Sequence, residues 1–184
     1  MTINACIEEV LITHEMIVNK CEELGKRITK DYEGKTPILI GLLKGAIPFM
    51  AELMKHIECD METDFIDVSS YDGVESTGKI KILKDINTDI NGRHILLIDD
   101  IIDTGLTLSE VIKLLKSRNA LTVHTVTLVD KPEGRKVSGF EPQYVGYNIP
   151  NRFVVGFGLD YNELYRNLPY IGVLKKSVYE NKED

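Results

Sequence analysis

A cluster of small polar residues between positions 99 and 107 has the composition of a site that binds both an anion and a cation. The cluster consists of Asp99, Asp100, Asp103, Thr104, Gly105, Leu106 and Thr107. Gly105 allows a phosphate to approach the backbone closely, and the threonine hydroxyls can donate further hydrogen bonds. Adjacent carboxylates repel an anion, so they suit a hard cation or ribose hydroxyls better. Helix capping explains any one Asp or Thr, but three acids, two threonines and a glycine within nine residues favour a binding site.

The segments on both sides of this cluster predict that it joins a strand to a helix. Residues 95–98 are all apolar and β-branched at both ends, which is typical of a strand buried on both faces. Leu108, Val111, Ile112 and Leu115 have the spacing of an amphipathic helix. Backbone N–H groups and the helix dipole attract phosphate to a helix N-terminus, and open α/β sheets bind ligands at the carboxyl ends of their strands. We therefore expect the cluster to lie at that edge.

The rest of the chain alternates between segments with the apolar pattern of a helix and segments with the apolar pattern of a strand. Helices are expected at residues 3–31 and through Phe49, Leu53 and Ile57, strands at 37–43, 62–69, 79–82, 121–129, 144–148 and 153–157, and a loose polar tail at 175–184. This alternation predicts an α/β fold in which helices flank a mostly parallel, twisted sheet. The length of 184 residues suits a single domain spanning residues 1–184.

Composition and charge exclude several classes of function. No apolar run approaches the roughly 20 residues of a membrane span, and no basic N-terminal region precedes an apolar stretch, so we expect neither a membrane segment nor a secretory signal. A net charge of −7 argues against a nucleic-acid partner. The three cysteines are scattered, which favours reduced thiols and a cytoplasmic location.

Three other segments carry residues with chemical potential. Lys44 and Gly45 directly follow the strand expected at 37–43, and Lys131 follows the strand expected at 121–129. Residues 69–78 form a long polar segment, and long segments of this kind are often functional. Each lysine could equally be an ordinary charge on a solvated turn, so the residues alone leave both interpretations open.

Residues 98–107 resemble the ribose-phosphate signature of the type I phosphoribosyltransferases. The third acid, Asp103, makes the segment similar to the hypoxanthine-guanine phosphoribosyltransferase branch. That branch commonly has Glu as its first acid, whereas this chain has the shorter Asp99. Four further motifs follow the order of the family, at Lys44-Gly45, at Lys131, at Phe153 and at Leu159–Arg166. The resemblance therefore covers nearly the whole chain.

The resemblance implies a role for each motif. The 5′-phosphate and ribose would be bound by Asp99, Asp100, Asp103, Thr104, Gly105, Leu106 and Thr107, pyrophosphate by Lys44, Gly45 and Arg166, and the purine by Lys131, Phe153, Val154 and Asp160. Asp99, Asp100 and Asp160 would hold Mg²⁺, Ser70 and Tyr71 would belong to a lid, and Asp103 would be the catalytic base. The substrates implied are phosphoribosyl pyrophosphate and a 6-oxopurine base. A small hood subdomain built from both chain termini and a homodimer or homotetramer are also implied.

Three alternatives remain to be weighed against this interpretation. Residues 73–79 fit the G-x-x-x-x-G-K pattern of nucleotide hydrolases, but Ile80 stands where a metal-ligating Ser or Thr is needed, and a strand pattern follows instead of a helix. Phospho-receiver domains also combine an acid pair with Lys-Pro, but they need an acceptor Asp that this sequence lacks. A regulatory relative that binds nucleotides without catalysis would have no use for a proton acceptor such as Asp103.

Overall fold

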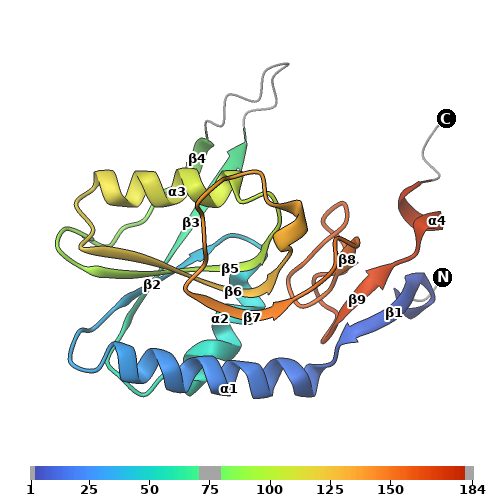
Figure 1. The fold of residues 1–184 in the computed structure, drawn as a ribbon, viewed down its shortest axis with the longest axis horizontal. Coiled ribbons are helices and arrows are strands. Elements are labelled where there is room, and N and C mark those ends of the chain that lie inside the picture. The colour runs from blue at the N-terminus through green and yellow to red at the C-terminus, as the bar shows by residue number, and fades with distance from the viewer. Residues whose placement is uncertain (1–2, 71–79, 181–184) are drawn as a thin grey trace.

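The computed structural model describes residues 3–70 and 80–180. A six-stranded sheet with strand order β4-β3-β2-β5-β6-β7 forms its centre (Figure 1). These strands are β2 (Ile38–Leu42), β3 (Glu62–Ser70), β4 (Ile80–Lys84), β5 (His94–Ile102), β6 (Thr122–Asp130) and β7 (Tyr144–Asn148). All neighbouring pairs are parallel except β3 and β4, which are antiparallel. The predicted mostly parallel sheet is confirmed.

Helices cover both faces of this sheet. The helices α1 (His14–Asp31) and α2 (Ala46–Leu53), with the 3₁₀ turn η2 (Met54–His56), lie on one face, and α3 (Leu106–Ser117) lies on the other (Figure 1). Leu96 and Ile98 of β5 belong to the core on the α1 side, whereas Ile95 and Leu97 belong to the core on the α3 side. The alternation of side chains along a strand thus buries every apolar residue of this run, as its composition predicts.

A second sheet of three antiparallel strands brings the two ends of the chain together. It has the order β1-β9-β8, with β1 (Ile7–Ile12), β8 (Val154–Val155) and β9 (Ile171–Leu174). Short helical turns flank it at η1 (Ile3–Cys6) and α4 (Lys176–Tyr179), and η3 (Pro132–Gly134) follows β6. This sheet lies beside the central one (Figure 1), at the place where the resemblance puts the hood.

The prediction of one helix over residues 3–31 is wrong at its amino end. Residues 7–12 pair with β9 as a strand, and α1 begins only at His14. The hydroxyl of Thr13 caps α1 by accepting the backbone N–H of Met16 at 3.3 Å, which ends the strand and starts the helix at one residue. The apolar residues of 7–12 fit a helical stripe equally well, so the distant strand β9 decides their conformation.

The tail expected to be loose at residues 175–184 instead makes specific contacts over residues 175–180, the part that the structure describes. The N–H of Lys175 donates to the carbonyl of Cys6 at 2.9 Å, and Tyr179 at the end of α4 packs against Phe153. The strand expected at 153–157 is shorter, since only Val154 and Val155 pair with β9.

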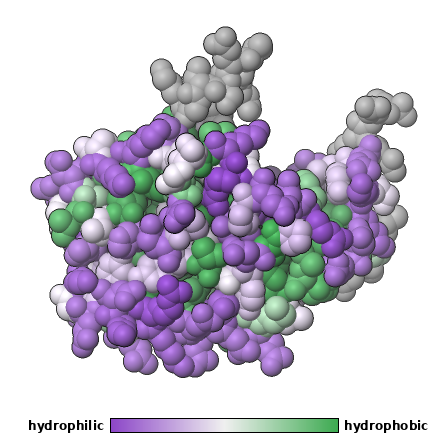
Figure 2. All heavy atoms as spheres, viewed as in Figure 1, coloured by the Kyte–Doolittle hydropathy of each residue, from purple (hydrophilic) through white to green (hydrophobic). Residues whose placement is uncertain are grey.

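No helix among the described residues has the length and apolar composition to cross a membrane. Hydrophilic side chains cover most of the face shown in Figure 2, with hydrophobic groups between them. Tyr71 and the phosphate-loop pattern at 73–79 lie outside the described residues.

Candidate active site

The strand order of the central sheet reverses between β2 and β5. The chain proceeds from β2 to β3 on one side and from β5 to β6 on the other, and β2 and β5 are parallel neighbours with Gly41 opposite Ile98. Their carboxyl ends therefore open a crevice, which is where ligands bind in such sheets. A cleft of about 390 Å³ lies there, and ten of the predicted site residues line it. They are Lys44, Gly45, Asp99, Asp100, Asp103, Lys131, Phe153, Val154, Asp160 and Arg166.

Two adjacent carboxylates form the floor of this cleft. Asp99 and Asp100 lie within the last residues of β5, and Asp100 is 9% exposed. Burial raises the pKa of Asp99 well above its usual range, and the neighbouring charge of Asp100 raises it further. Burial also raises the pKa of Asp100, although hydrogen bonds and the charge of Arg166 oppose this. A cation between or beside the two groups would let both ionise, so the pair has the donor chemistry for Mg²⁺.

Position 45 has room only for glycine, because the side chain of Asp100 occupies the space that a Cβ atom would need. A Cβ atom at this position would lie 1.9 Å from Oδ2 of Asp100. The loop of Lys44 and Gly45, which begins with a cis peptide bond between Leu43 and Lys44, therefore lies directly against Asp100.

The predicted phosphate turn joins β5 to α3. Gly105 has φ +76°, a left-handed conformation that favours glycine, and α3 begins at the next residue. The N–H of Leu106 donates to the hydroxyl of Thr104 at 3.4 Å. Asp103 is the one residue of this turn that lines the cleft. The other predicted phosphate-binding residues of the turn, Thr104, Gly105, Leu106 and Thr107, are not among the lining residues.

Lys131 and Asp103 meet because their strands are in register. Ile102 of β5 lies opposite Asp130 of β6, so the next residue of each strand is a neighbour of the other. The Nζ atom of Lys131 lies 3.3 Å from Oδ2 of Asp103. Lys131 is only 6% exposed, so this ammonium group is held in place at the cleft wall.

Phe153 presents an exposed aromatic ring at the hood side of the cleft. Phe153 is 39% exposed, whereas the residues that follow it in β8 are buried in the core. Its ring stacks on Tyr179 at a centroid distance of 4.9 Å and meets the edge of Tyr161 at 5.6 Å. Val154, the next residue, is buried in β8 and also lines the cleft. The placement suits an aromatic platform for a planar ligand.

Four charged side chains converge between the loop after β2 and the segment that joins β8 to β9. Nη2 of Arg166 lies 3.0 Å from Oδ1 of Asp160 and 3.2 Å from Oε1 of Glu163, and Nζ of Lys44 lies 2.8 Å from Oε2 of Glu163. Nη1 of Arg166 donates to the carbonyl of Gly158 at 2.7 Å, while its buried Nε has no hydrogen-bond partner in the described part of the chain. The predicted pyrophosphate cations are therefore brought together.

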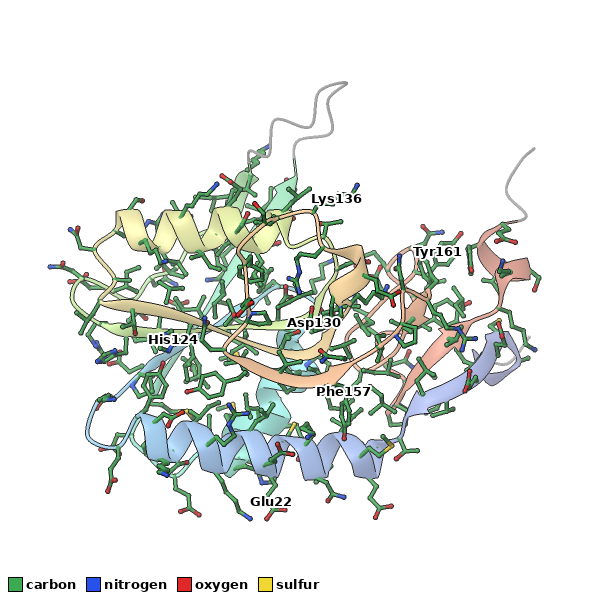
Figure 3. The ribbon with its side chains drawn as sticks, viewed as in Figure 1. Glu22, His124, Asp130, Lys136, Phe157 and Tyr161 are labelled. Carbon is green, nitrogen blue, oxygen red and sulfur yellow. The ribbon has the colours of Figure 1, made fainter. Side chains whose placement is uncertain are left out.

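Two residues at the site were absent from the predicted set. Glu163 pairs with both cations, and Arg135 forms an ion pair with the buried Asp130. Asp130 is the last residue of β6 and is labelled in Figure 3. Nη1 of Arg135 is buried without a hydrogen-bond partner among the described residues, and it lies 3.2 Å from the point that a Cβ of Gly105 would occupy. Neither residue was singled out from the sequence: Arg135 pairs with an acid five residues before it across a turn, and the contact of Glu163 with Lys44 joins segments 119 residues apart.

The three predicted metal ligands do not form one cluster. Among the residues that the structure describes, no group of three or more His, Cys, Asp and Glu side chains is arranged to hold a metal ion. Mg²⁺ commonly uses one or two carboxylates together with waters and substrate phosphates, so the pair Asp99 and Asp100 still fits this ion. Ser70 is the last residue of β3, and Tyr71 lies outside the described part of the chain.

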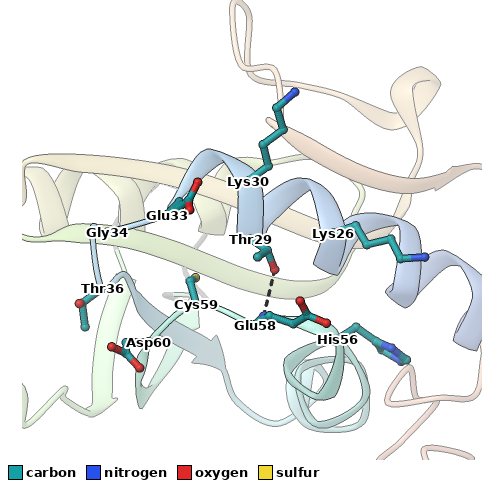
Figure 4. A pocket seen from close by; sticks show the side chains of 10 residues that line it. All are labelled: Lys26, Thr29, Lys30, Glu33, Gly34, Thr36, His56, Glu58, Cys59 and Asp60. Carbon is teal, nitrogen blue, oxygen red and sulfur yellow. Dashed lines mark hydrogen bonds between the residues drawn. The ribbon is translucent and has the colours of Figure 1, made fainter.

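A larger hollow of about 770 Å³ lies elsewhere on the molecule (Figure 4). It is formed by the end of α1 and the segment between η2 and β3, where the N–H of Glu58 donates to the hydroxyl of Thr29 at 3.0 Å. The segment preceding β2 also contributes, so this hollow lies at the amino ends of the parallel strands. None of the predicted site residues lines it.

Comparison with known proteins identifies the class to which this site belongs. A family model described as the phosphoribosyl transferase domain matches residues 9–162. The chain belongs to the phosphoribosyltransferase family, as residues 98–107 indicated.

Individual relatives carry a more specific name. A hypoxanthine-guanine phosphoribosyltransferase of Lactococcus lactis is 55% identical over 178 residues, which are 96% of each protein. A protein of the same name from Streptococcus pyogenes is 56% identical over 174 residues, covering 94% of this chain and 96% of the relative. The crystal structure of a hypoxanthine phosphoribosyltransferase from Staphylococcus aureus has a TM-score of 0.94 and 51% identity, with 97% of both chains covered.

Proposed function

We propose that the protein is a purine salvage enzyme of the hypoxanthine-guanine phosphoribosyltransferase type. It transfers the 5-phosphoribosyl group of phosphoribosyl pyrophosphate to N9 of hypoxanthine or guanine, which yields inosine or guanosine monophosphate and pyrophosphate. The contact between Lys131 and Asp103 carries this proposal, because it places a cationic donor beside a proton acceptor at the cleft wall. The names of the relatives agree with it.

The two groups match one edge of a 6-oxopurine. O6 and N7 lie side by side on that edge. Lys131 would donate a hydrogen bond to O6, while Asp103 would accept the proton of N7 as N9 forms the new bond to C1 of the ribose. Adenine carries an amino group at position 6, so it would leave the buried ammonium unpaired. Phe153 would stack on the purine face, and Val154 and Asp160 would complete the base site.

The phosphate groups would bind on the other side of the reacting carbon. The 5′-phosphate would lie on the turn from Asp103 to Thr107, where backbone N–H groups and the helix dipole favour an anion. Lys44 and Arg166 would bind pyrophosphate and stabilise the charge that grows on it as the glycosidic bond breaks.

Mg²⁺ is the proposed cofactor. Asp99 and Asp100 would hold one ion, and their position as an adjacent pair beneath Gly45 supports this role, while Asp160 would hold a second ion directly or through water. Mg²⁺ would supply charge neutralisation to the departing pyrophosphate and orientation to the ribose hydroxyls.

The remaining features of the proposal rest on the family. Ser70 and Tyr71 would belong to a lid that excludes water from the reacting centre. The assignment of residues 1–184 to one domain and the homodimer or homotetramer stay predictions. A cytoplasmic location agrees with Cys6, Cys21 and Cys59 being free thiols.

Nucleotide formation tests the proposal against the regulatory alternative. The protein is incubated with phosphoribosyl pyrophosphate, Mg²⁺ and hypoxanthine, guanine or xanthine, and the products are separated by chromatography. Turnover of hypoxanthine or guanine that stops when Mg²⁺ is chelated is the expected result. Tight nucleotide binding without turnover of any purine would instead identify a regulatory protein.

A further inference from the structure

Glu163 neutralises both cations that are proposed to hold pyrophosphate. One of its carboxylate oxygens lies 2.8 Å from Nζ of Lys44, and the other lies 3.2 Å from Nη2 of Arg166. Lys44 follows β2, whereas Glu163 and Arg166 follow β8, so the carboxylate links two segments that are 119 residues apart. A carboxylate that engages two cations through two oxygens has the charge and shape of one edge of a phosphate group.

The backbone of Glu163 is anchored, but its side chain is not buried. Its N–H donates to Oδ2 of Asp160 at 2.9 Å, and the loop is closed by a bridge between Tyr161 and Leu164. The side chain of Glu163 is 63% exposed, and that of Lys44 is 60% exposed. The hydrogen bond from Lys44 and the charge of Arg166 lower the pKa of Glu163, so the carboxylate is ionised at neutral pH.

We propose that Glu163 is an internal stand-in for pyrophosphate, which holds Lys44 and Arg166 in place when the site is empty and must move aside when the substrate binds. The proposal rests on the proposed function, because it assumes that these two cations receive pyrophosphate. Glu163 occupies N–H donors of both cations and its negative charge repels a second anion, so it competes with the pyrophosphate group of the substrate and with the pyrophosphate product. Glu163 thereby lowers the affinity of the site for both and favours product release.

The competition has a limited size. Water screens exposed ion pairs of this kind, so each of the two pairs has only a small effect on affinity. Removing the charge of Glu163 should therefore tighten pyrophosphate binding by about two- to tenfold. Arg166 retains its contacts with Asp160 and Gly158, so its position should persist without Glu163.

The variant Glu163→Gln tests this role, with Glu23→Gln as the matched control. Glu23 is 55% exposed and forms an ion pair with Lys20 on α1, remote from the cleft. Binding of magnesium pyrophosphate is measured by titration calorimetry, together with kcat and KM for phosphoribosyl pyrophosphate. We expect Glu163→Gln to lower the dissociation constant of pyrophosphate and KM by about two- to tenfold, without raising KM for the purine. Glu23→Gln should match the wild type.

Glu163→Ala is a second variant that removes the carboxylate without leaving a new hydrogen-bonding group, and thermal melting verifies that both variants fold. Unchanged or weaker pyrophosphate binding in both variants would overturn the proposal, since it would assign Glu163 a structural or metal-binding role. Failure of the wild type to bind pyrophosphate or form nucleotides would overturn the proposed function itself, and this outcome is visible before any variant is compared.

Discussion

Replacing Asp103 with Asn should abolish most of the catalytic rate while leaving the phosphate site intact. The amide keeps the size of the side chain and an oxygen that can accept from Lys131, but it cannot take a proton from N7 of the purine. Loss of a general base lowers the rate by about 10²–10⁴-fold, which is about 3–5 kcal/mol at 1.36 kcal/mol per factor of ten. We expect kcat to fall by this amount.

A loss of rate could also come from weakening the contact between Asp103 and Lys131, and the structure limits the size of that effect. The side chain of Asp103 is 47% exposed and lies 3.3 Å from Lys131, so their ion pair is partly solvated. The amide oxygen of Asn can still accept from the nearly buried Lys131, so the substitution costs at most the difference between a charged and a neutral hydrogen bond, about 1.5 kcal/mol, which corresponds to about a tenfold effect on rate. Weakening the contact with Lys131 therefore cannot account for a hundredfold loss. The affinity for phosphoribosyl pyrophosphate should change little, because the proposed ligands of the 5′-phosphate are backbone N–H groups, Thr104 and Thr107.

Single-turnover kinetics and a separate titration of phosphoribosyl pyrophosphate distinguish the two effects. An unchanged rate of the chemical step in Asp103→Asn, or a loss confined to the affinity for phosphoribosyl pyrophosphate, would refute the general-base assignment. Asp103 would then be a structural residue of the turn.

Three further substitutions probe separate parts of the account. Lys131→Met should raise KM for hypoxanthine by about 10- to 100-fold, because a charged hydrogen bond to O6 contributes about 1.5–3 kcal/mol; an unchanged KM would exclude that contact. Gly45→Ala should weaken Mg²⁺-dependent turnover, since its Cβ would lie 1.9 Å from Oδ2 of Asp100; wild-type activity at limiting Mg²⁺ would contradict this. Burial raises the pKa of Asp64, but three backbone N–H donors outweigh it and lower the pKa from 3.8 to about 2. The lowered pKa corresponds to about 2.4 kcal/mol of folding stability at pH 7. Because 1 kcal/mol shifts the Tm of a protein of this size by about 2–4 °C, Asp64→Asn should lower Tm by about 5–10 °C. The stabilisation is present above pH 4 and is lost as the pH falls towards 2, so the difference in Tm should narrow over that range, whereas the exposed Asp60→Asn should show neither effect.

The parts of the fold that depend on local patterns could be predicted from the sequence. The apolar run at 95–98 and the helical spacing from Leu108 to Leu115 each specify an element without reference to the rest of the chain, and β5 and α3 formed there. Residues 7–12 were predicted as helix because their apolar spacing fits both structures. Only their pairing with β9, more than 150 residues away, makes them a strand.

The same distinction applies to the site. The acid cluster and its turn could be found from residue types alone, since they are contiguous. Lys131, Phe153 and Arg166 were assigned only through the resemblance, because a lysine, a phenylalanine or an arginine has many ordinary roles. The contacts of Glu163 with Lys44 and of Tyr179 with Phe153 join distant segments, and no pattern in the sequence connects them.

The ratio of kcat/KM for hypoxanthine to that for adenine tests the central claim most directly. A site that hydrogen-bonds a substrate group rejects an analogue without that group by about 10⁴–10⁵-fold. If Lys131 binds O6 and Asp103 accepts the proton of N7, the wild-type protein should prefer hypoxanthine by a factor of this order. A ratio near one, or a preference for adenine, would contradict the account.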